Sequence, residues 1–198
     1  MTESVDLLER LRAGDEAAFR ELFDAHHAML VRLALAYVKS ASVAEEVAQD
    51  TWTAIIDALP TFEGRSSIKT WIARIAINRA KTRAQRDGRQ VPLDDEEPPS
   101  TDDRFGSIGQ FKRRPATFDS PEALLANAEI RAAIDRCLER LPEQQRAIVT
   151  LRDLEGWSSE EVCNVLALSE SNQRVLLHRG RQRLREALEK ALEGRESP

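Results

Sequence analysis

Charged side chains divide residues 42–86 into two stretches of opposite sign. In residues 42–59 the charged residues are all acidic: Glu45, Glu46, Asp50 and Asp57. In residues 68–86 they are all basic: Lys69, Arg74, Arg79, Lys81, Arg83 and Arg86. Carboxylates suit a basic protein surface, whereas clustered lysine and arginine suit a nucleic-acid backbone. The pattern predicts a protein that binds two partners, although a helical hairpin whose charges only keep it soluble would show the same segregation.

A second basic cluster lies near the carboxyl end of the sequence. Residues 157–169 have the pattern of a cap, a short helix and a tight turn, and a long helix is expected from Glu170 to about residue 192. Such a pair is typical of a helix-turn-helix whose second helix enters the major groove. Apolar residues of that helix, Leu176, Leu177 and Leu184, would then face the core. The side chains expected to face DNA are Asn172, Arg174, Val175, His178, Arg179 and Arg181.

Helices must position the two charged stretches at 42–86. Ser42 and Glu45 have the spacing of a capping box at the start of an acidic helix, which Pro60 ends. A loop, residues 61–67, then leads to a basic helix that Ser66 or Ser67 would cap.

Aromatic residues flank this loop on both sides. Phe62 and Trp71 would make a plausible pocket for an unstacked base, because an aromatic platform returns about 1–3 kcal/mol per stacked base. The alternative is that Phe62, Trp52 and Trp71 are core aromatics at helical spacing. For the two tryptophans core packing is the favoured interpretation.

Composition indicates an all-α protein of two small domains. The 198 residues are 41% hydrophobic and 32% charged, and few runs favour strands. We expect an N-terminal helical bundle at residues 1–86 and a helix-turn-helix domain at 121–198, joined by a flexible linker at 87–120 that is rich in acids and prolines. The formal net charge of −5 does not exclude nucleic-acid binding, because the lysine and arginine residues are concentrated in two helices.

Few residues suggest catalysis or metal binding. The adjacent His26 and His27 point about 100° apart on a helix and have no companion ligand nearby. Cys137 and Cys163 lack the spacing of a zinc or redox site and are expected to be small buried hydrophobes. The sequence predicts no enzyme activity, no metal and no cofactor. Without a signal peptide or a long apolar run, the protein is expected to be cytoplasmic and not inserted in a membrane.

Three segments carry a resemblance to a known family, the extracytoplasmic-function sigma factors, which are promoter-recognition subunits of bacterial RNA polymerase. Residues 44–52 (AEEVAQDTW) resemble the family's polymerase-clamp helix. Residues 62–80 (FEGRSSIKTWIARIAINRA) resemble its promoter-melting loop and the basic helix that follows. Residues 141–162 (LPEQQRAIVTLRDLEGWSSEEV) are similar to the start of its C-terminal helix-turn-helix domain.

The resemblance implies a role for each group of residues. Those implied to bind polymerase are Glu45, Glu46, Gln49 and Asp50. Those implied to melt or bind the downstream promoter element are Phe62, Arg65, Ser66, Ser67, Lys69, Arg74, Asn78, Arg79 and Arg83. The helix-turn-helix would read the upstream element. In the linker, Asp94, Asp95, Glu96 and Glu97 could mimic a phosphate backbone in the polymerase's RNA path, although a passive tether is the alternative.

The sequence of the recognition helix departs from the motif that is usual in the family. Residues 171–177 (SNQRVLL) replace the common GTVKSRL, and Ala167 stands where the turn glycine is usual. The identity of the promoter therefore does not transfer.

The leading hypothesis is a sigma factor whose partners are core RNA polymerase, promoter DNA and an anti-sigma protein. The alternative is a stand-alone helix-turn-helix transcriptional regulator, which would bind a palindrome without polymerase. A nucleic-acid enzyme would need clustered carboxylates near the basic helix, yet only Glu63 and Asp87 flank it, from opposite ends.

Overall fold

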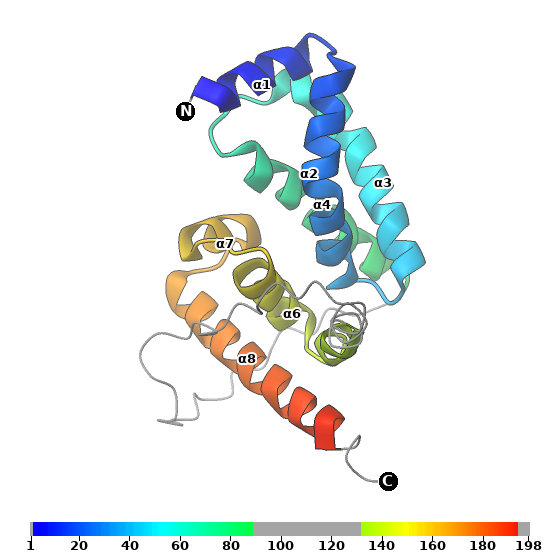
Figure 1. The fold of residues 1–198 in the computed structure, drawn as a ribbon, viewed down its shortest axis with the longest axis vertical. Helices are drawn as coiled ribbons and strands as arrows, with labels where there is room; N and C mark the ends of the chain where they lie inside the picture. Colours follow the sequence, from blue (N-terminus) through cyan, green and yellow to red (C-terminus); the bar gives the residue numbers. More distant parts are fainter. Residues whose placement is uncertain (1, 89–131, 194–198) are drawn as a thin grey trace, which may run out of the picture. The chain divides into compact units, whose positions relative to one another are not determined.

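The computed structural model describes residues 2–88 and 132–193, and all regular structure in these ranges is helical (Figure 1). These residues fall into two compact units, the first formed by residues 2–88 and 142–180 and the second by residues 132–141 and 181–193. The linker predicted at 87–120, with its acidic run, lies almost wholly outside the described residues, and the domain boundaries predicted there stay predictions.

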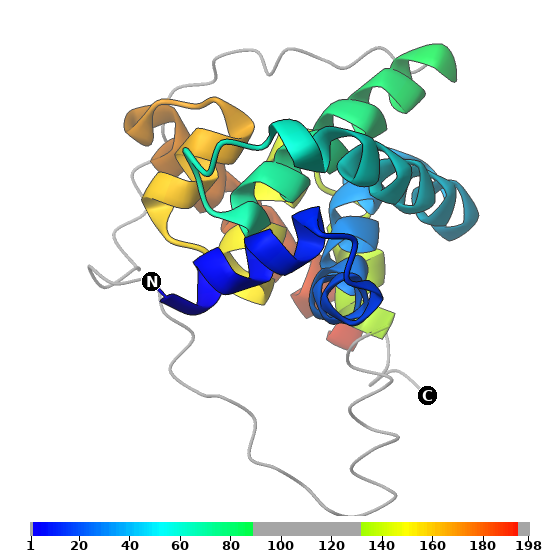
Figure 2. The same cartoon turned by 90° about the horizontal axis from the view of Figure 1, so that it is seen from above.

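Four α-helices make the N-terminal part of the first unit. They are α1 (Thr2–Arg12), α2 (Glu16–Leu35), α3 (Ala41–Ala58) and α4 (Ile68–Arg86), and a 3₁₀ turn, η1 (Leu59–Thr61), follows α3. Helices α2, α3 and α4 contact one another pairwise, and α1 runs across the axis of α2 (Figures 1 and 2). Fully buried Leu30, Leu33, Ile55, Ile72 and Ile77 form their common core.

Side-chain caps fix where these helices begin. The Asp15 carboxylate accepts from the backbone N–H groups of Ala17 and Ala18 at 2.8 and 3.2 Å, and the Ser67 hydroxyl accepts from Thr70 at 3.1 Å. Of the two serines that the sequence offered as the cap of the basic helix, Ser66 and Ser67, the structure uses Ser67. The Arg10 guanidinium, bonded to Asp15, lowers the pKa of that carboxyl, so it stays ionised at the helix start.

The capping box predicted from Ser42 and Glu45 is wrong. Helix α3 begins earlier, because Ser40 adopts an extended backbone and its hydroxyl accepts from the Val43 N–H at 3.3 Å. Ser42 therefore lies inside the first turn, where its hydroxyl is 3.1 Å from that of Ser40. The side chain of Glu45 does not cap the helix and points towards α2 instead.

The C-terminal helices begin with a helical segment at residues 132–138. Helix α6 (Glu143–Val149) follows and continues into a π-helical turn, η2 (Thr150–Leu154). Next come α7 (Ser159–Leu166) and the long α8 (Glu170–Glu193), which matches the expected length. Gly180 allows a close approach of α8 to α6, since a Cβ there would lie 2.8 Å from Val149 Cγ2.

The pair α7 and α8 forms the predicted helix-turn-helix. Ser158 and Glu161 make a capping box at the start of α7, with bonds of 3.1 and 2.8 Å between their side chains and backbone N–H groups. Ala167 ends α7 in the left-handed conformation, at φ 56° and ψ 47°. Ser169 caps α8 by accepting from the Asn172 N–H at 3.3 Å. Across the described residues, no helix is both long and apolar enough to span a bilayer.

The left-handed alanine generates a stability prediction. The left-handed conformation costs a residue with a Cβ roughly 1–2 kcal/mol of stability. Glycine avoids this cost, but its greater freedom in the unfolded chain lowers the stability of the folded state by about 0.4–1 kcal/mol. We expect Ala167→Gly to raise the free energy of unfolding by about 0.5–1 kcal/mol in urea titrations. Ala25→Gly, at an exposed position inside α2, is the control and should lower it by about 1 kcal/mol. Equal losses for both variants would contradict a strained turn.

Candidate protein and nucleic-acid interfaces

The first half of α3 presents an acidic face to solvent. Glu46, Gln49 and Asp50 are exposed and Glu45 is partly exposed, while Ala44, Val47, Ala48 and Thr51 are buried. The spacing of the four polar residues places them on one side of the helix. The structure thus brings together all four residues that were predicted to bind a protein partner, and we call them the acidic face.

Two carboxylates of the acidic face are tied to neighbouring helices. Glu45 lies 3.0 Å from His27 Nε2 on α2, and Glu46 lies 3.1 Å from Arg83 Nη1 on α4. Neither pairing was foreseen, because sequence spacing says little about which side chains meet across two helices. Arg83 also bonds Asp87 at 3.3 Å, and this bond, with Glu46 nearby, raises the pKa of Arg83. Its charge is therefore shared between α3 and the end of α4.

The loop between α3 and α4 contains one buried residue, Phe62, followed by several exposed ones. Phe62 is only 7% exposed and its ring centroid lies 4.6 Å from that of Trp71, while Arg12 donates to its carbonyl. Arg65, Ser66 and Ser67 are exposed, although Arg65 pairs with Glu63 and the Ser67 hydroxyl caps α4. In this conformation the Phe62 ring packs in the core, so the polar part of the loop is the surface open to a ligand.

Helix α4 carries the predicted basic surface. Arg74, Asn78 and Arg79 are exposed along one side, while Lys69 and Arg83 are partly buried. Lys69 Nζ lies 4.4 Å from the centroid of the Trp157 ring, and Arg74 donates to the Asn164 carbonyl, both within the first compact unit. The exposed side of α4 continues towards Arg86 at its end.

A groove of about 490 Å³ runs between α3 and α4 beside this basic surface. Its charged and amide lining residues are Asp50, Asn78, Arg79, Arg83 and Arg86. Three guanidinium groups along one groove suit phosphate oxygens, which arginine can bind with two parallel hydrogen bonds. The groove adjoins the acidic face through Asp50, so the two predicted binding surfaces share a border.

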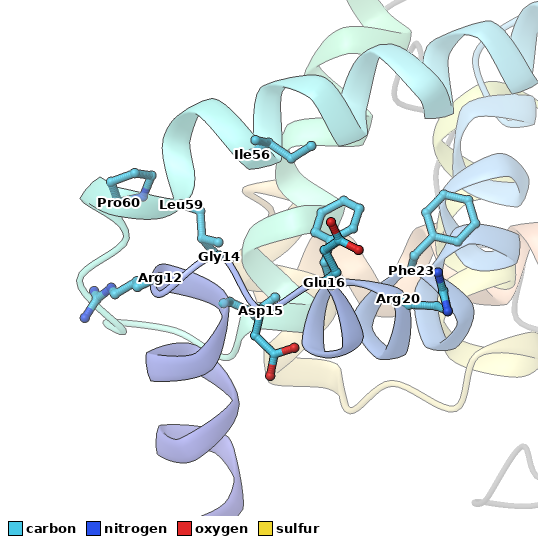
Figure 3. Close-up of a pocket in the computed structure, with 11 residues that line it drawn as sticks. Arg12, Gly14, Asp15, Glu16, Arg20, Phe23, Ile56, Leu59 and Pro60 are labelled. Carbon is cyan, nitrogen blue, oxygen red and sulfur yellow. The ribbon is translucent and has the colours of Figure 1, made fainter.

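A larger hollow of about 630 Å³ lies among α1, α2 and α3 (Figure 3). Its wall includes Phe19, Phe23, Ile56 and Leu59, and Ile56 is 53% exposed. The Asp15 carboxylate at its edge is engaged in capping α2. Nothing in this lining resembles a nucleophile paired with a base, so the hollow gives no reason to infer catalysis.

The helix-turn-helix exposes the start of its second helix. Asn172, Arg174 and His178 are exposed, and Val175, Arg179 and Arg181 are partly buried. Buried Leu176 and Leu177 face the core as predicted, whereas Leu184 is only partly buried. The Ser159 hydroxyl donates to Gln173 Oε1 at 3.0 Å, which ties α7 to α8. Both helices are therefore fixed relative to each other, while three of the predicted base-reading side chains, Asn172, Arg174 and His178, lie fully on the surface.

Residues with metal-ligand chemistry do not gather anywhere in the ranges 2–88 and 132–193. Cys137 is buried and Cys163 partly buried, and both are free thiols. Burial lowers the pKa of His26, which keeps its ring neutral near pH 7.

The geometry defines a class of protein: a helix-turn-helix DNA-binding protein with a separate helical surface that is acidic on one helix and basic on the next. Comparison with known proteins narrows the class. The family model for sigma-70 region 2 matches residues 22–90, and the model for sigma-70 region 4 matches residues 131–184. The sigma-E factor of Salmonella typhimurium, an extracytoplasmic-function RNA polymerase sigma factor, is 33% identical over 182 residues, or 92% of each chain. The RNA polymerase sigma-H factor of Pseudomonas aeruginosa is 33% identical over 94% of this chain and 92% of its own.

The chain therefore belongs to the extracytoplasmic-function sigma factors of the sigma-70 family. Solved structures agree on the fold. CnrH, determined with the cytosolic domain of CnrY, matches with a TM-score of 0.59 at 22% identity over 98% of this chain and 99% of its own. RpoE of Bartonella quintana, determined with the anti-sigma factor NepR, matches with a TM-score of 0.60 at 20% identity over 86% and 96%. The predicted family and all-helical fold class are confirmed.

The exposed Arg174 allows a direct test of base reading. Its ion pair with Glu170, at 3.0 Å, is exposed and so contributes little, which leaves the guanidinium able to turn to a guanine edge. We expect Arg174→Ala to weaken binding to the upstream promoter element by roughly 1–3 kcal/mol and to relax preference at one base pair. The control is Lys190→Ala, which removes an exposed basic side chain nearer the end of the same helix. Competition binding against single-base variants measures both effects, and an equal loss on every sequence would reassign Arg174 to a phosphate.

Proposed function

We propose that this protein binds core RNA polymerase through the acidic face of α3 and directs it to promoters. The observation that carries the proposal is the position of Glu45, Glu46, Gln49 and Asp50 on one side of α3, beside the arginine-lined groove of α3 and α4. A basic surface of polymerase would meet the carboxylates while DNA lies along the arginines. Adjacent surfaces of opposite sign favour the two partners binding together rather than in competition.

The downstream promoter element would be opened by the loop before α4. Extracting a base from a duplex costs a few kcal/mol, so the loop must supply compensating contacts. The exposed Arg65 and Ser66 are suited to a flipped base, and Arg74, Asn78 and Arg79 to the phosphates beside it. Phe62 would add stacking only after leaving its place against Trp71, which favours the polar part of the loop for the first contact.

The upstream element would be read by α8. Arg174 and Asn172 have the donors for guanine and adenine edges, and Val175 suits a thymine methyl. Three further side chains complete the proposed DNA surface: His178, Arg179 and Arg181.

The further partner we infer is an anti-sigma protein. Both solved structures named above were determined in complex with a second protein, and one of these partners is an anti-sigma factor by name. A subunit that works with polymerase on DNA would act in the cytoplasm, and in this function the protein carries out no catalytic step and needs no cofactor.

Run-off transcription tests the proposed function. The assay combines matched core polymerase, the purified protein and upstream fragments of the source genome, with transcript starts sequenced. We expect discrete starts that depend on the protein and are lost with Asp50→Ala, whereas the control Asp57→Ala, an exposed acid later on α3, retains them. Specific duplex binding by the protein alone, without core binding or initiation, would instead establish a stand-alone regulator.

Permanganate footprinting tests the melting role of the loop. Thymines of the downstream element should become reactive with core and the wild-type protein, because unpaired thymine is accessible to the reagent. The Arg65→Ala/Ser66→Ala variant should reduce this reactivity while leaving binding of the upstream duplex element unchanged. Unchanged reactivity in the variant would remove these two side chains from the melting step.

A further inference from the structure

A cluster of rings joins α2 to α3 beneath the acidic face. Phe19, Phe23 and His27 follow one another at four-residue intervals on α2 and meet Trp52 of α3. Phe23 stacks on His27 with centroids 4.5 Å apart and planes 12° apart. Trp52 packs against Phe23 at 5.0 Å and edge-on to Phe19 at 5.7 Å. One face of the His27 imidazole is therefore held by Phe23, whose ring is in turn packed against Trp52.

Both ring nitrogens of this imidazole have a polar neighbour, one through a hydrogen bond and one through a short contact with a carboxylate. The indole N–H of Trp52 can only donate, and it lies 3.2 Å from His27 Nδ1, so Nδ1 acts as the acceptor. In the neutral ring the proton is then on Nε2, which lies 3.0 Å from Glu45 Oε1. A continuous series of polar contacts therefore leads from Trp52 through His27 to Glu45.

The exposed fraction of these three residues increases along the series of contacts, from the core to the surface. Trp52 is 5% exposed, whereas the side chains of His27 and Glu45 are 24% and 44% exposed. The inner end is thus fixed by packing, and the outer end is a carboxylate that still has a second oxygen for a ligand. The contact with this packed imidazole restricts the orientation of the Glu45 side chain. Glu46 differs, because its partner Arg83 is also bonded to Asp87 at the end of α4.

We propose that His27 is a positioning residue for polymerase binding, which holds the Glu45 carboxylate in its binding orientation before polymerase arrives. This inference rests on the proposed function of the acidic face. A long side chain that is ordered in advance loses less conformational entropy on binding. His27 itself does not touch polymerase in this account, and it acts through Glu45.

The test is the affinity of the full-length protein for core polymerase, measured by titration of a fluorescently labelled chain. His27→Phe keeps a ring for stacking but removes the polar contacts of both ring nitrogens, and it should weaken binding about three- to tenfold, the range expected for one ordered side chain. His27→Gln keeps an amide that can donate to Glu45, and its affinity should stay within about twofold of wild type. Thermal unfolding of each variant confirms that it is folded at the assay temperature.

A double-mutant cycle separates positioning from a general structural effect. Glu45→Ala alone should weaken core binding, and adding His27→Phe to it should cause no further loss. Two results would contradict the positioning role. In one, His27→Phe weakens core binding as much in the Glu45→Ala background as in the wild type. In the other, it does not weaken core binding in the wild type at all. Asp50→Ala distinguishes the two levels of the account. If Asp50→Ala weakens binding and Glu45→Ala does not, only this inference fails, and if neither does, the acidic face itself is not the polymerase site.

Discussion

The close packing of α3 against α4 is the constraint on which the proposed binding surfaces depend. Alanines are fully buried on both helices, at Ala44 and Ala48 on α3 and at Ala73, Ala76 and Ala80 on α4. Small side chains at a contact let helix axes approach closely. An acidic and a basic surface therefore border each other so closely that Glu46 and Arg83 form an ion pair.

This closeness has an electrostatic consequence for a protein with a net charge of −5. Opposite charges held in contact would cancel each other's field if they were buried, but Glu46 and Arg83 keep side-chain exposures of 57% and 34%. Exposed pairs typically contribute only about 0–1 kcal/mol, so either member can exchange its partner for a ligand at little cost. The pairing of Glu45 with His27 is different in kind, because stacking on Phe23 and a hydrogen bond from Trp52 hold the imidazole in place. The acidic face thus combines one exchangeable and one fixed carboxylate.

Local sequence signals predicted the helices well because helix ends depend on nearby residues. Asp15, Ser67 and Ser169 cap the helices that follow them, and the helix-turn-helix lies where the pattern indicated. Ser42 misled because Ser40, two residues earlier, competes for the same role and has the extended backbone. The burial of Phe62 and the bonds of His27 depend on partners elsewhere in the chain, Trp71 and Trp52, and no local rule specifies them. The four-residue spacing of Phe19, Phe23 and His27 was the available sign that His27 belongs to an aromatic stripe.

Photo-cross-linking in an initiation complex tests most directly whether neighbouring helices bind different partners. A photoreactive amino acid would replace Glu46 on α3 or Arg79 on α4, one at a time, in complexes of the protein with core polymerase and promoter DNA. The account predicts that position 46 cross-links to a polymerase subunit and position 79 to promoter DNA. If position 46 reacted with DNA and not with polymerase, the acidic face would not be the polymerase-binding surface and the division of labour between α3 and α4 would be wrong.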